Sequence, residues 1–120
     1  MITFKPDEAK IKMARDHVAE IAAEWPVDVY FVRVVTSELV TNAIRHAGTD
    51  EVRVDAYADG DVYVVEVWDG DRTLPLVCPP APDGLSGRGL MLIGELVSRW
   101  GTLRDEKEGG KVVFAEWRAR

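Results

Sequence analysis

The chain has 120 residues, 47% of them hydrophobic, which is enough for one domain with an apolar core and too few for two. Its formal net charge of -6, from 21 acidic and 15 basic side chains, makes the phosphate backbone of a nucleic acid a poor partner. A single cysteine, Cys78, and two histidines, His17 and His46, argue against an internal disulfide or a zinc site. No apolar run approaches the roughly 20 residues that span a bilayer, and residues 1–7 lack a signal peptide's apolar core. We therefore expect a single soluble domain over residues 1–120, cytoplasmic, with no contact to nucleic acid or membrane.

The first part of the chain predicts a short strand and an amphipathic helix. Residues 1–5 can form the strand, and Pro6 favours a helix start because its ring fixes φ. Apolar residues then recur at steps of three and four over residues 9–23, namely Ile11, Ala14, Val18, Ile21 and Ala22. Trp25-Pro26 ends this helix.

A second helix, over residues 28–47, carries the first candidate site. Asp28 can cap its start and Gly48 can end it. Its expected apolar stripe consists of Phe31, Val35, Leu39 and Ile44, widened by Val32, Val40 and Ala43. Glu38 and Asn42 lie outside the stripe and four residues apart, so they project from neighbouring turns of one helix face. A carboxylate beside an amide can hold a divalent cation and polarise a hydroxyl, although a solvated polar helix edge explains this stretch equally well.

The period of the pattern then changes from helical to two. Residues 51–58 and 62–68 flank the turn Asp59-Gly60, which predicts a β-hairpin that covers the helix. Asp69-Gly70-Asp71 follows at once and places a carboxylate where the strand leaves the sheet. Asp-Gly is also ordinary turn chemistry, so this tripeptide alone says little about function.

Residues 72–85 predict a long loop, because they contain Pro75, Pro79, Pro80 and Pro82 and have no usable period. Loops of this length often act as lids or binding segments. The next segment, Ser86-Gly87-Arg88-Gly89-Leu90, opens a third helix whose glycines let backbone amides approach an anion such as phosphate. A simple junction between a loop and a helix explains the same residues.

Residues 98–103 and 112–117 predict the last two strands, joined by a polar turn at 106–110. The resulting order predicts an α+β fold, a two-layer sandwich with one mixed, mostly antiparallel sheet and three helices on one face. In that arrangement the Glu38 and Asn42 face and the Gly87 to Gly89 turn meet at one edge of the helical layer.

Four segments together resemble the boxes of the GHKL ATP-binding fold, also called the Bergerat fold, which histidine kinases and DNA gyrase share. In chain order they are Glu38-Leu39-Val40-Thr41-Asn42-Ala43, Val67-Trp68-Asp69, Ser86-Gly87-Arg88-Gly89-Leu90 and Gly109-Gly110-Lys111-Val112-Val113-Phe114. The likeness covers almost the whole chain and is greatest to the stand-alone anti-sigma-factor serine/threonine kinases of actinobacteria and bacilli. Four boxes in order are far more specific than any one of them.

The resemblance implies ATP and Mg²⁺ as ligands and assigns roles to single residues. Asn42 is expected to coordinate the Mg²⁺ that bridges the phosphates, and Glu38 to act as the base that polarises the attacking hydroxyl. Asp69 is expected to accept a hydrogen bond from the adenine amino group. The phosphates are expected on the third box, that is on Ser86, Gly87, Arg88, Gly89 and Leu90, beneath a lid formed by residues 72–85. Arg45 and His46 follow the usual end of the first box and are expected at the edge of the site.

Two departures from the family pattern concern the adenine pocket. Many relatives have Asp-x-Gly-x-Gly in the second box, where this chain has Asp69-Gly70-Asp71-Arg72-Thr73. Many also have a threonine that helps to bind adenine where this chain has Val112. Asp71 is expected to repel a triphosphate unless a cation lies between them. These departures predict a reshaped pocket and weaker nucleotide binding.

Two functions follow from the resemblance. In the first, the protein transfers the γ-phosphoryl group of ATP to a serine or threonine of a small anti-sigma-factor antagonist of STAS type, and also sequesters a sigma factor. Homodimers are common among the related anti-sigma factors. In the second, it is a non-catalytic binding module of the same fold. The presence of Glu38 with Asn42 favours the first function, and the altered second box favours the second.

Overall fold

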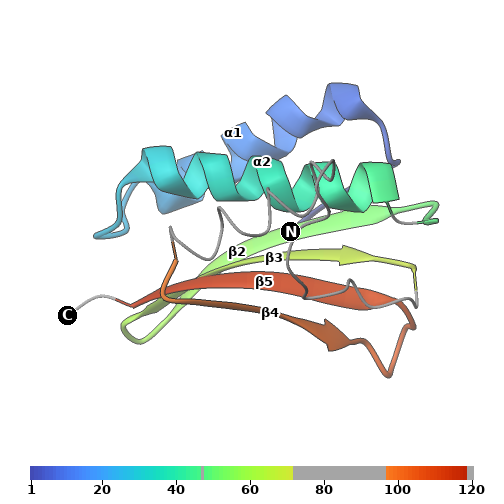
Figure 1. The fold of residues 1–120 in the computed structure, drawn as a ribbon. Helices are drawn as coiled ribbons and strands as arrows, with labels where there is room; N and C mark the ends of the chain where they lie inside the picture. Colours follow the sequence, from blue (N-terminus) through green and yellow to red (C-terminus); the bar gives the residue numbers. More distant parts are fainter. Residues whose placement is uncertain (47, 72–96, 119–120) are drawn as a thin grey trace, which may run out of the picture.

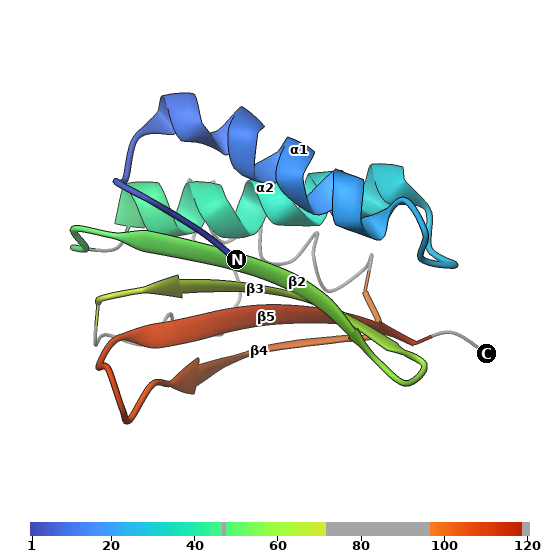
Figure 2. The same cartoon turned by 180° about the vertical axis from the view of Figure 1, so that it is seen from behind.

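The computed structural model describes residues 1–46, 48–71 and 97–118. The elements in this part of the chain are β1 (Ile2–Phe4), the 3-10 helix η1 (Glu8–Lys10), α1 (Ile11–Ala22), α2 (Val29–His46), β2 (Val52–Asp59), β3 (Val62–Asp69), β4 (Arg99–Arg104) and β5 (Lys111–Arg118). The strands form one five-stranded sheet in the order β1-β2-β3-β5-β4, with antiparallel neighbours throughout. Both α-helices lie on the same face of this sheet (Figure 1; Figure 2). The expected α+β sandwich is confirmed, while the third helix and the proline-rich loop fall outside the described residues.

Short polar side chains set the helix starts. The Asp7 carboxylate accepts a hydrogen bond from the Ala9 backbone N–H at 2.9 Å at the start of η1. The Asp28 carboxylate does the same for the Tyr30 N–H at 2.9 Å, as its position before α2 predicted. These bonds satisfy amide donors that have no partner within the helix itself.

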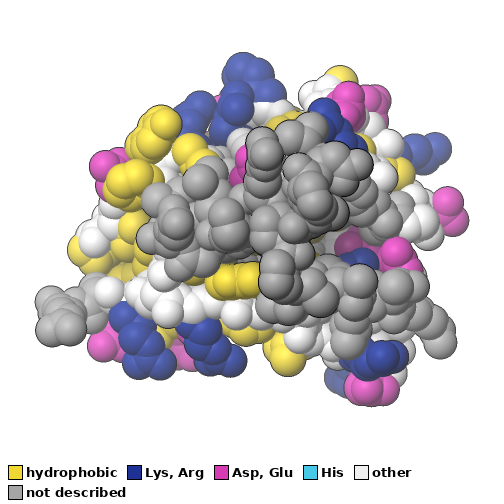
Figure 3. All heavy atoms as spheres, in the orientation of Figure 1, with side chains coloured by type: hydrophobic (Ala, Val, Ile, Leu, Met, Phe, Trp, Pro, Cys, Tyr) yellow, Lys and Arg dark blue, Asp and Glu magenta, His cyan; other side chains and the backbone are white. Residues whose placement is uncertain are grey.

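Helix α2 buries most of the predicted stripe, but Thr36 is added to it, Ile44 is only partly buried and Phe31 lies outside it. The residues buried in the core are Val32, Val35, Thr36, Leu39, Val40 and Ala43. Phe31, placed in the stripe by the sequence pattern, is instead 38% exposed and packs edge-on against Tyr30 with ring centroids 5.7 Å apart. Figure 3 shows hydrophobic side chains at the end of the molecule where α2 begins, on the left of the view. Phe31 precedes Glu38 by two helical turns, so it lies on the same side of α2 as Glu38 and Asn42 rather than on the sheet side.

Alternation along the strands separates a helix-facing side of the sheet from an outer side. Val54 pairs with Val67 and Ala56 pairs with Val65 on the helix-facing side, as the predicted hairpin required. β5 continues this side with every second residue, namely Lys111, Val113, Ala115 and Trp117. Within the described residues, no helix is long and apolar enough to cross a membrane.

Candidate functional site

Three segments from distant parts of the sequence meet at one end of the sheet, where β3 stops and β5 starts. The C-terminal end of α2, the C-terminal end of β3 and the start of β5 lie side by side there in both views (Figure 1; Figure 2). We call this edge, with residues 48–51, 69–71 and 109–111, the site edge. It contains residues of the second and fourth predicted boxes and lies next to the end of α2, the helix that carries the first box.

Asn42 has an unusual environment in the last part of α2. Its side-chain Nδ2 is buried and has no hydrogen-bond partner. A buried amide that lacks a partner costs free energy, on the order of 1–3 kcal/mol, so this group requires a partner such as water, an ion or a ligand. Glu38 lies one turn earlier on the same side, is partly buried, and forms no ion pair with any described residue.

Asp69 ends β3 and is almost fully enclosed, with 1% of its surface exposed. Its Oδ1 accepts hydrogen bonds from Lys111 Nζ and from the Asp71 backbone N–H, each at 2.9 Å. Burial disfavours the charged form and raises the pKa of this carboxyl, although the Lys111 ammonium and the Asp71 amide act in the opposite direction. The predicted adenine-reading carboxylate is therefore present and buried at the site edge.

The sequence pattern did not single out Lys111, which faces Asp69 directly. The two residues are cross-strand partners in the β3 and β5 pairing, and Lys111 is 6% exposed. Val112, to which the family comparison drew attention, pairs with Trp68 and so points to the outer side of the sheet. Lys111, and not Val112, is therefore the residue of β5 that contacts the Asp69 carboxylate. Counting alternate residues back from the buried Trp117 would have placed Lys111 on the helix-facing side, but the pairing with Asp69 depends on the strand register.

Gly110 allows β5 to start in contact with the end of β3. Its φ is +80°, and a Cβ atom at this position would lie 2.1 Å from the Asp69 backbone oxygen. Only glycine tolerates both this conformation and this close approach. The glycines of the fourth box therefore have a structural role in bringing Lys111 beside Asp69.

Thr49 connects the end of α2 to the same edge. Its hydroxyl donates to the Glu51 carbonyl at 2.7 Å and accepts from the Gly70 and Glu51 amides at 2.7 and 3.3 Å. The Gly48 amide also donates to Asp71 Oδ2 at 3.4 Å. These bonds hold the loop after α2 against the segment that follows β3.

Contacts on the outer side of the sheet stabilise the backbone of the site edge. The Arg53 guanidinium stacks on the Trp68 ring, 4.0 Å from its centroid, and Trp68 Nε1 donates to the Gly109 carbonyl at 3.0 Å. Arg53 also pairs with Glu51 and Glu108 at 2.6 and 2.8 Å. Residues from two strands and two loops thereby fix the backbone that carries Asp69 and Lys111.

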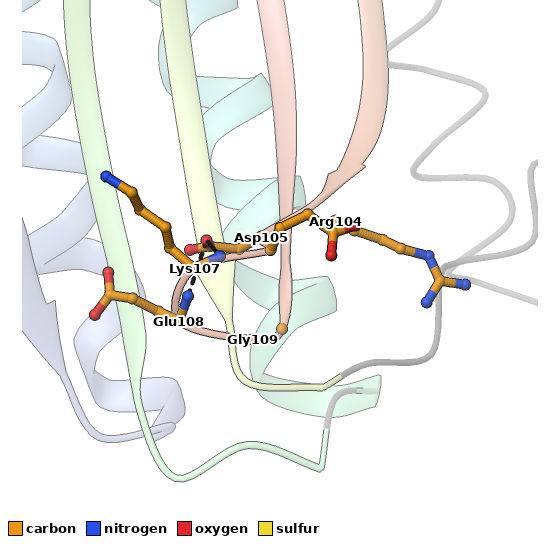
Figure 4. A pocket seen from close by; sticks show the side chains of 7 residues that line it. Arg104, Asp105, Lys107, Glu108 and Gly109 are labelled. Carbon is orange, nitrogen blue, oxygen red and sulfur yellow. Dashed lines mark hydrogen bonds between the residues drawn. The ribbon is translucent and has the colours of Figure 1, made fainter.

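A shallow hollow of about 230 Å³ lies at the turn between β4 and β5, lined by residues 104–110. Figure 4 shows that Arg104 and Lys107 extend away from each other here. The Asp105 carboxylate is directed back to the turn, where it accepts from the Lys107 and Glu108 amides at 3.1 and 3.2 Å. The hollow is the inside of a polar turn and does not adjoin the Asn42 amide.

The predicted site residues therefore fall into two groups. Glu38, Asn42 and Asp69 belong to α2 and the adjoining end of β3, which α2 packs against. The third box, Ser86, Gly87, Arg88, Gly89 and Leu90, lies outside the described residues, as do Thr73 and Cys78. Arg45 turns towards Glu8, with Nε 2.6 Å from Oε1.

The described residues contain no group of three histidine, cysteine, aspartate or glutamate side chains that could hold a metal ion. A magnesium ion carried by a nucleotide needs fewer protein ligands, because phosphate oxygens and water supply the others. The Asn42 side chain can supply one such oxygen, and its Nδ2, which is buried without a partner among the described residues, can donate to a phosphate or to a water molecule.

Comparisons with known proteins agree with the fold. The structure resembles the histidine kinase domain of the blue-light activated histidine kinase of Erythrobacter litoralis EL346, with a TM-score of 0.58 at 18% identity over 96% of this chain and 61% of that one. A longer structure of the same kinase gives a TM-score of 0.57 at 20% identity, over 92% of this chain and 41% of that one. This chain thus spans less than two thirds of either structure, and no curated protein matches it in sequence.

A family model settles the classification. Residues 4–117 match the family described as histidine kinase-like ATPase domain, which is nearly the whole chain. Membership implies an ATP-binding, kinase-like domain of GHKL type. The chain therefore belongs to the histidine kinase-like ATPase domain family.

Proposed function

We propose that the protein is an ATP-dependent serine/threonine kinase of the anti-sigma-factor type. It transfers the γ-phosphoryl group of Mg-ATP to a small anti-sigma-factor antagonist of STAS type, and it also sequesters a sigma factor. The observation that carries the nucleotide site is the buried Asn42 amide without a partner, one turn beyond Glu38 and on the helix that packs against β3. The motif likeness supports the choice of kinase type.

The chain's own residues divide the work of phosphoryl transfer. Asn42 offers the amide oxygen that holds the nucleotide's magnesium ion, and Asp69 offers a buried acceptor for the base. Glu38, partly exposed and without an ion pair among the described residues, is available to accept the proton of an incoming hydroxyl. Positioning and charge neutralisation supply most of the rate in reactions of this kind.

A non-catalytic binding module remains the second candidate, and one contact favours it. Lys111 already occupies Asp69 Oδ1, and Asp71 Oδ2 lies 3.9 Å from the same ammonium group. A base that approaches Asp69 meets a carboxylate that is already paired, which lowers the affinity gained from each new hydrogen bond. In this alternative the fold holds a protein partner with little ATP turnover.

Nucleotide binding is tested by thermal unfolding in a titration of Mg-ATP. A ligand that binds only the folded state raises the melting temperature, and Asn42→Ala should remove that rise. Ser37→Ala, a polar change on the same helix away from the Glu38 side, is the matched control and should keep it. An unchanged melting curve of the wild-type protein at millimolar Mg-ATP would overturn the proposed site.

Phosphoryl transfer is tested with γ-labelled ATP and candidate small STAS-type proteins, followed by detection of phosphoserine or phosphothreonine. Glu38→Gln keeps the size of the side chain and should retain the ATP-induced rise in melting temperature while losing transfer by about 10²-fold or more. Transfer at the wild-type rate would show that another group acts as the base. Binding of ATP without transfer to any STAS-type partner would favour the binding module.

A further inference from the structure

Lys111 is the one basic side chain that is buried in the part of the chain that the structure describes. Lysine is rarely buried because its ammonium group loses hydration, and it persists inside proteins when it is paired. Here the pair is with Asp69, at 2.9 Å, on the helix-facing side of the sheet.

The contacts of Asp69 are unevenly divided between its two oxygens. Lys111 Nζ and the Asp71 amide both donate to Oδ1, and no described residue donates to Oδ2. Two donors on one oxygen fix the rotation of the carboxylate group about its Cβ–Cγ bond. Oδ2 is therefore the oxygen left for a ligand.

The charge of this carboxyl group decides which purine it can bind. An ionised carboxylate only accepts hydrogen bonds, and so it suits the exocyclic amino group of adenine. A protonated carboxyl, or an amide nitrogen in its place, donates a hydrogen bond and suits the carbonyl oxygen of hypoxanthine or guanine. Any group that fixes the charge and the rotation of Asp69 thereby fixes the choice of base.

We propose that Lys111 is a positioning residue that determines nucleobase selection by holding Asp69 ionised and turned so that Oδ2 faces the base. This inference rests on the proposed nucleotide site. Lys111 acts on the base only through Asp69, across the cross-strand pair that the Gly110 conformation makes possible. A purely structural pair would stabilise the sheet edge without affecting the ratio of affinities for two purines.

The experiment measures the dissociation constants of ATP and inosine triphosphate by titration calorimetry for the wild-type protein and for Lys111→Met. The two nucleotides differ at the group that Asp69 reads. The wild-type protein should prefer ATP by roughly tenfold or more, since a site that loses a hydrogen-bond partner discriminates strongly. Lys111→Met should narrow this ratio about tenfold, mainly through weaker ATP binding, and Lys111→Arg should restore part of it.

A second pair of variants distinguishes positioning from a loss of folding. In Asp69→Asn, Lys111 should bind the amide oxygen and turn the NH₂ group towards the base, which shifts the preference to inosine triphosphate. In Asp69→Asn/Lys111→Met only the Asp71 amide still donates to the side-chain oxygen, so the Asn side chain turns more easily and ATP binding should recover in part. Circular dichroism and denaturant unfolding identify any variant that is not folded. If Lys111→Met is not folded, the comparison of Asp69→Asn with Asp69→Asn/Lys111→Met decides whether Lys111 positions Asp69.

The outcomes separate this inference from the function on which it rests. If the wild-type protein binds neither nucleotide, the proposed nucleotide site fails. If the wild-type protein binds ATP and the ratio is unchanged in Lys111→Met, or Asp69→Asn prefers ATP with Lys111 in place, the site stands and the role of Lys111 is overturned.

Discussion

The same two strands, β3 and β5, form chemically opposite pairs at their two ends. At one end Tyr63 pairs with Trp117, and both belong to an aromatic group with Trp25, whose ring centroid is 5.3 Å from Tyr63 and 6.4 Å from Trp117. At the other end Asp69 pairs with Lys111 in an ion pair whose two side chains are both buried, whereas Tyr63 and Trp25 are only partly buried. Burying aromatic surface stabilises a fold, whereas burying an ion pair gains little over an apolar pair of the same shape. The difference indicates that one end maintains the fold and the other serves the ligand.

The largest expected effect concerns the aromatic end. Trp117→Ala removes a side chain that is 6% exposed, and should lower the free energy of unfolding by about 3–5 kcal/mol. Denaturant titration followed by circular dichroism measures this loss. A loss below about 1 kcal/mol would contradict the assignment of this end as the main stabilising contact.

The next effect concerns the close approach of β5 to β3. Gly110→Ala places a methyl group against the Asp69 backbone, and should lower the free energy of unfolding by about 1–3 kcal/mol more than Gly60→Ala does. Gly60 is the matched control, because its φ is +63° but a Cβ there meets nothing within 4 Å. Equal losses in the two variants, measured by denaturant unfolding, would show that the site edge yields more easily than its geometry indicates.

A third change tests whether the ionic end contributes to stability at all. Asp69→Asn/Lys111→Met removes both charges, and should leave the free energy of unfolding within about 1 kcal/mol of the wild-type value or raise it. Denaturant unfolding without nucleotide provides the measurement. A loss comparable to that of Trp117→Ala would remove the contrast between the two ends.

The pH dependence of stability tests the same end without changing its size. Because burial raises the pKa of Asp69 above its ordinary value of 3.8, the native state holds this proton more tightly than the unfolded state does. The contribution of Asp69 to stability is therefore fully present below pH 3.8 and is lost as the pH rises through the higher folded pKa. Relative to Asp69→Asn, the wild-type protein should gain stability on acidification from pH 7 towards pH 4. A difference between the two that is constant over this range would contradict the shift.

The smallest effect is expected at Arg45, which lies outside both ends. Its ion pair with Glu8 joins two half-exposed side chains, and such pairs contribute roughly 0.2–1 kcal/mol. Arg45→Ala should change the free energy of unfolding by no more than this and should keep the ATP-induced rise in melting temperature. Loss of that rise would instead place Arg45 in the nucleotide site.

Much of the fold could be predicted from periodicity, since each described strand and helix falls within a few residues of its expected range. Val54, Val67 and Leu39 are buried as predicted, because alternation and helical spacing report burial directly. Phe31 was misplaced because hydrophobicity alone cannot distinguish a residue at the margin of the stripe from one inside it. Its exposure depends on where α1 and the sheet contact α2, which is a property of the tertiary structure.

The candidate site could be predicted in part. Glu38, Asn42 and Asp69 were predicted as site residues from their motifs and stay predictions, and nothing in the motifs showed that Asn42 Nδ2 is buried without a partner among the described residues. Lys111 was missed because its importance depends on strand register, which a linear pattern does not specify across a gap of 42 residues between partners. Thr49 was missed for a similar reason, since a lone threonine after a helix has no characteristic signal.

The hydroxyl of Thr49 has one proton and two lone pairs, and all three are engaged, by the Glu51 carbonyl and by the Glu51 and Gly70 amides. This one oxygen atom therefore connects the loop that follows α2 to the segment that follows β3. A shift of Gly70 must break its hydrogen bond to Thr49 or move the start of β2 as well. Any rearrangement beside Asp69 is therefore transmitted to the loop that follows α2. Thr49→Val keeps the shape of the side chain but would leave all three backbone groups without this partner. The connection between the loop after α2 and the segment after β3 would then be lost at this point.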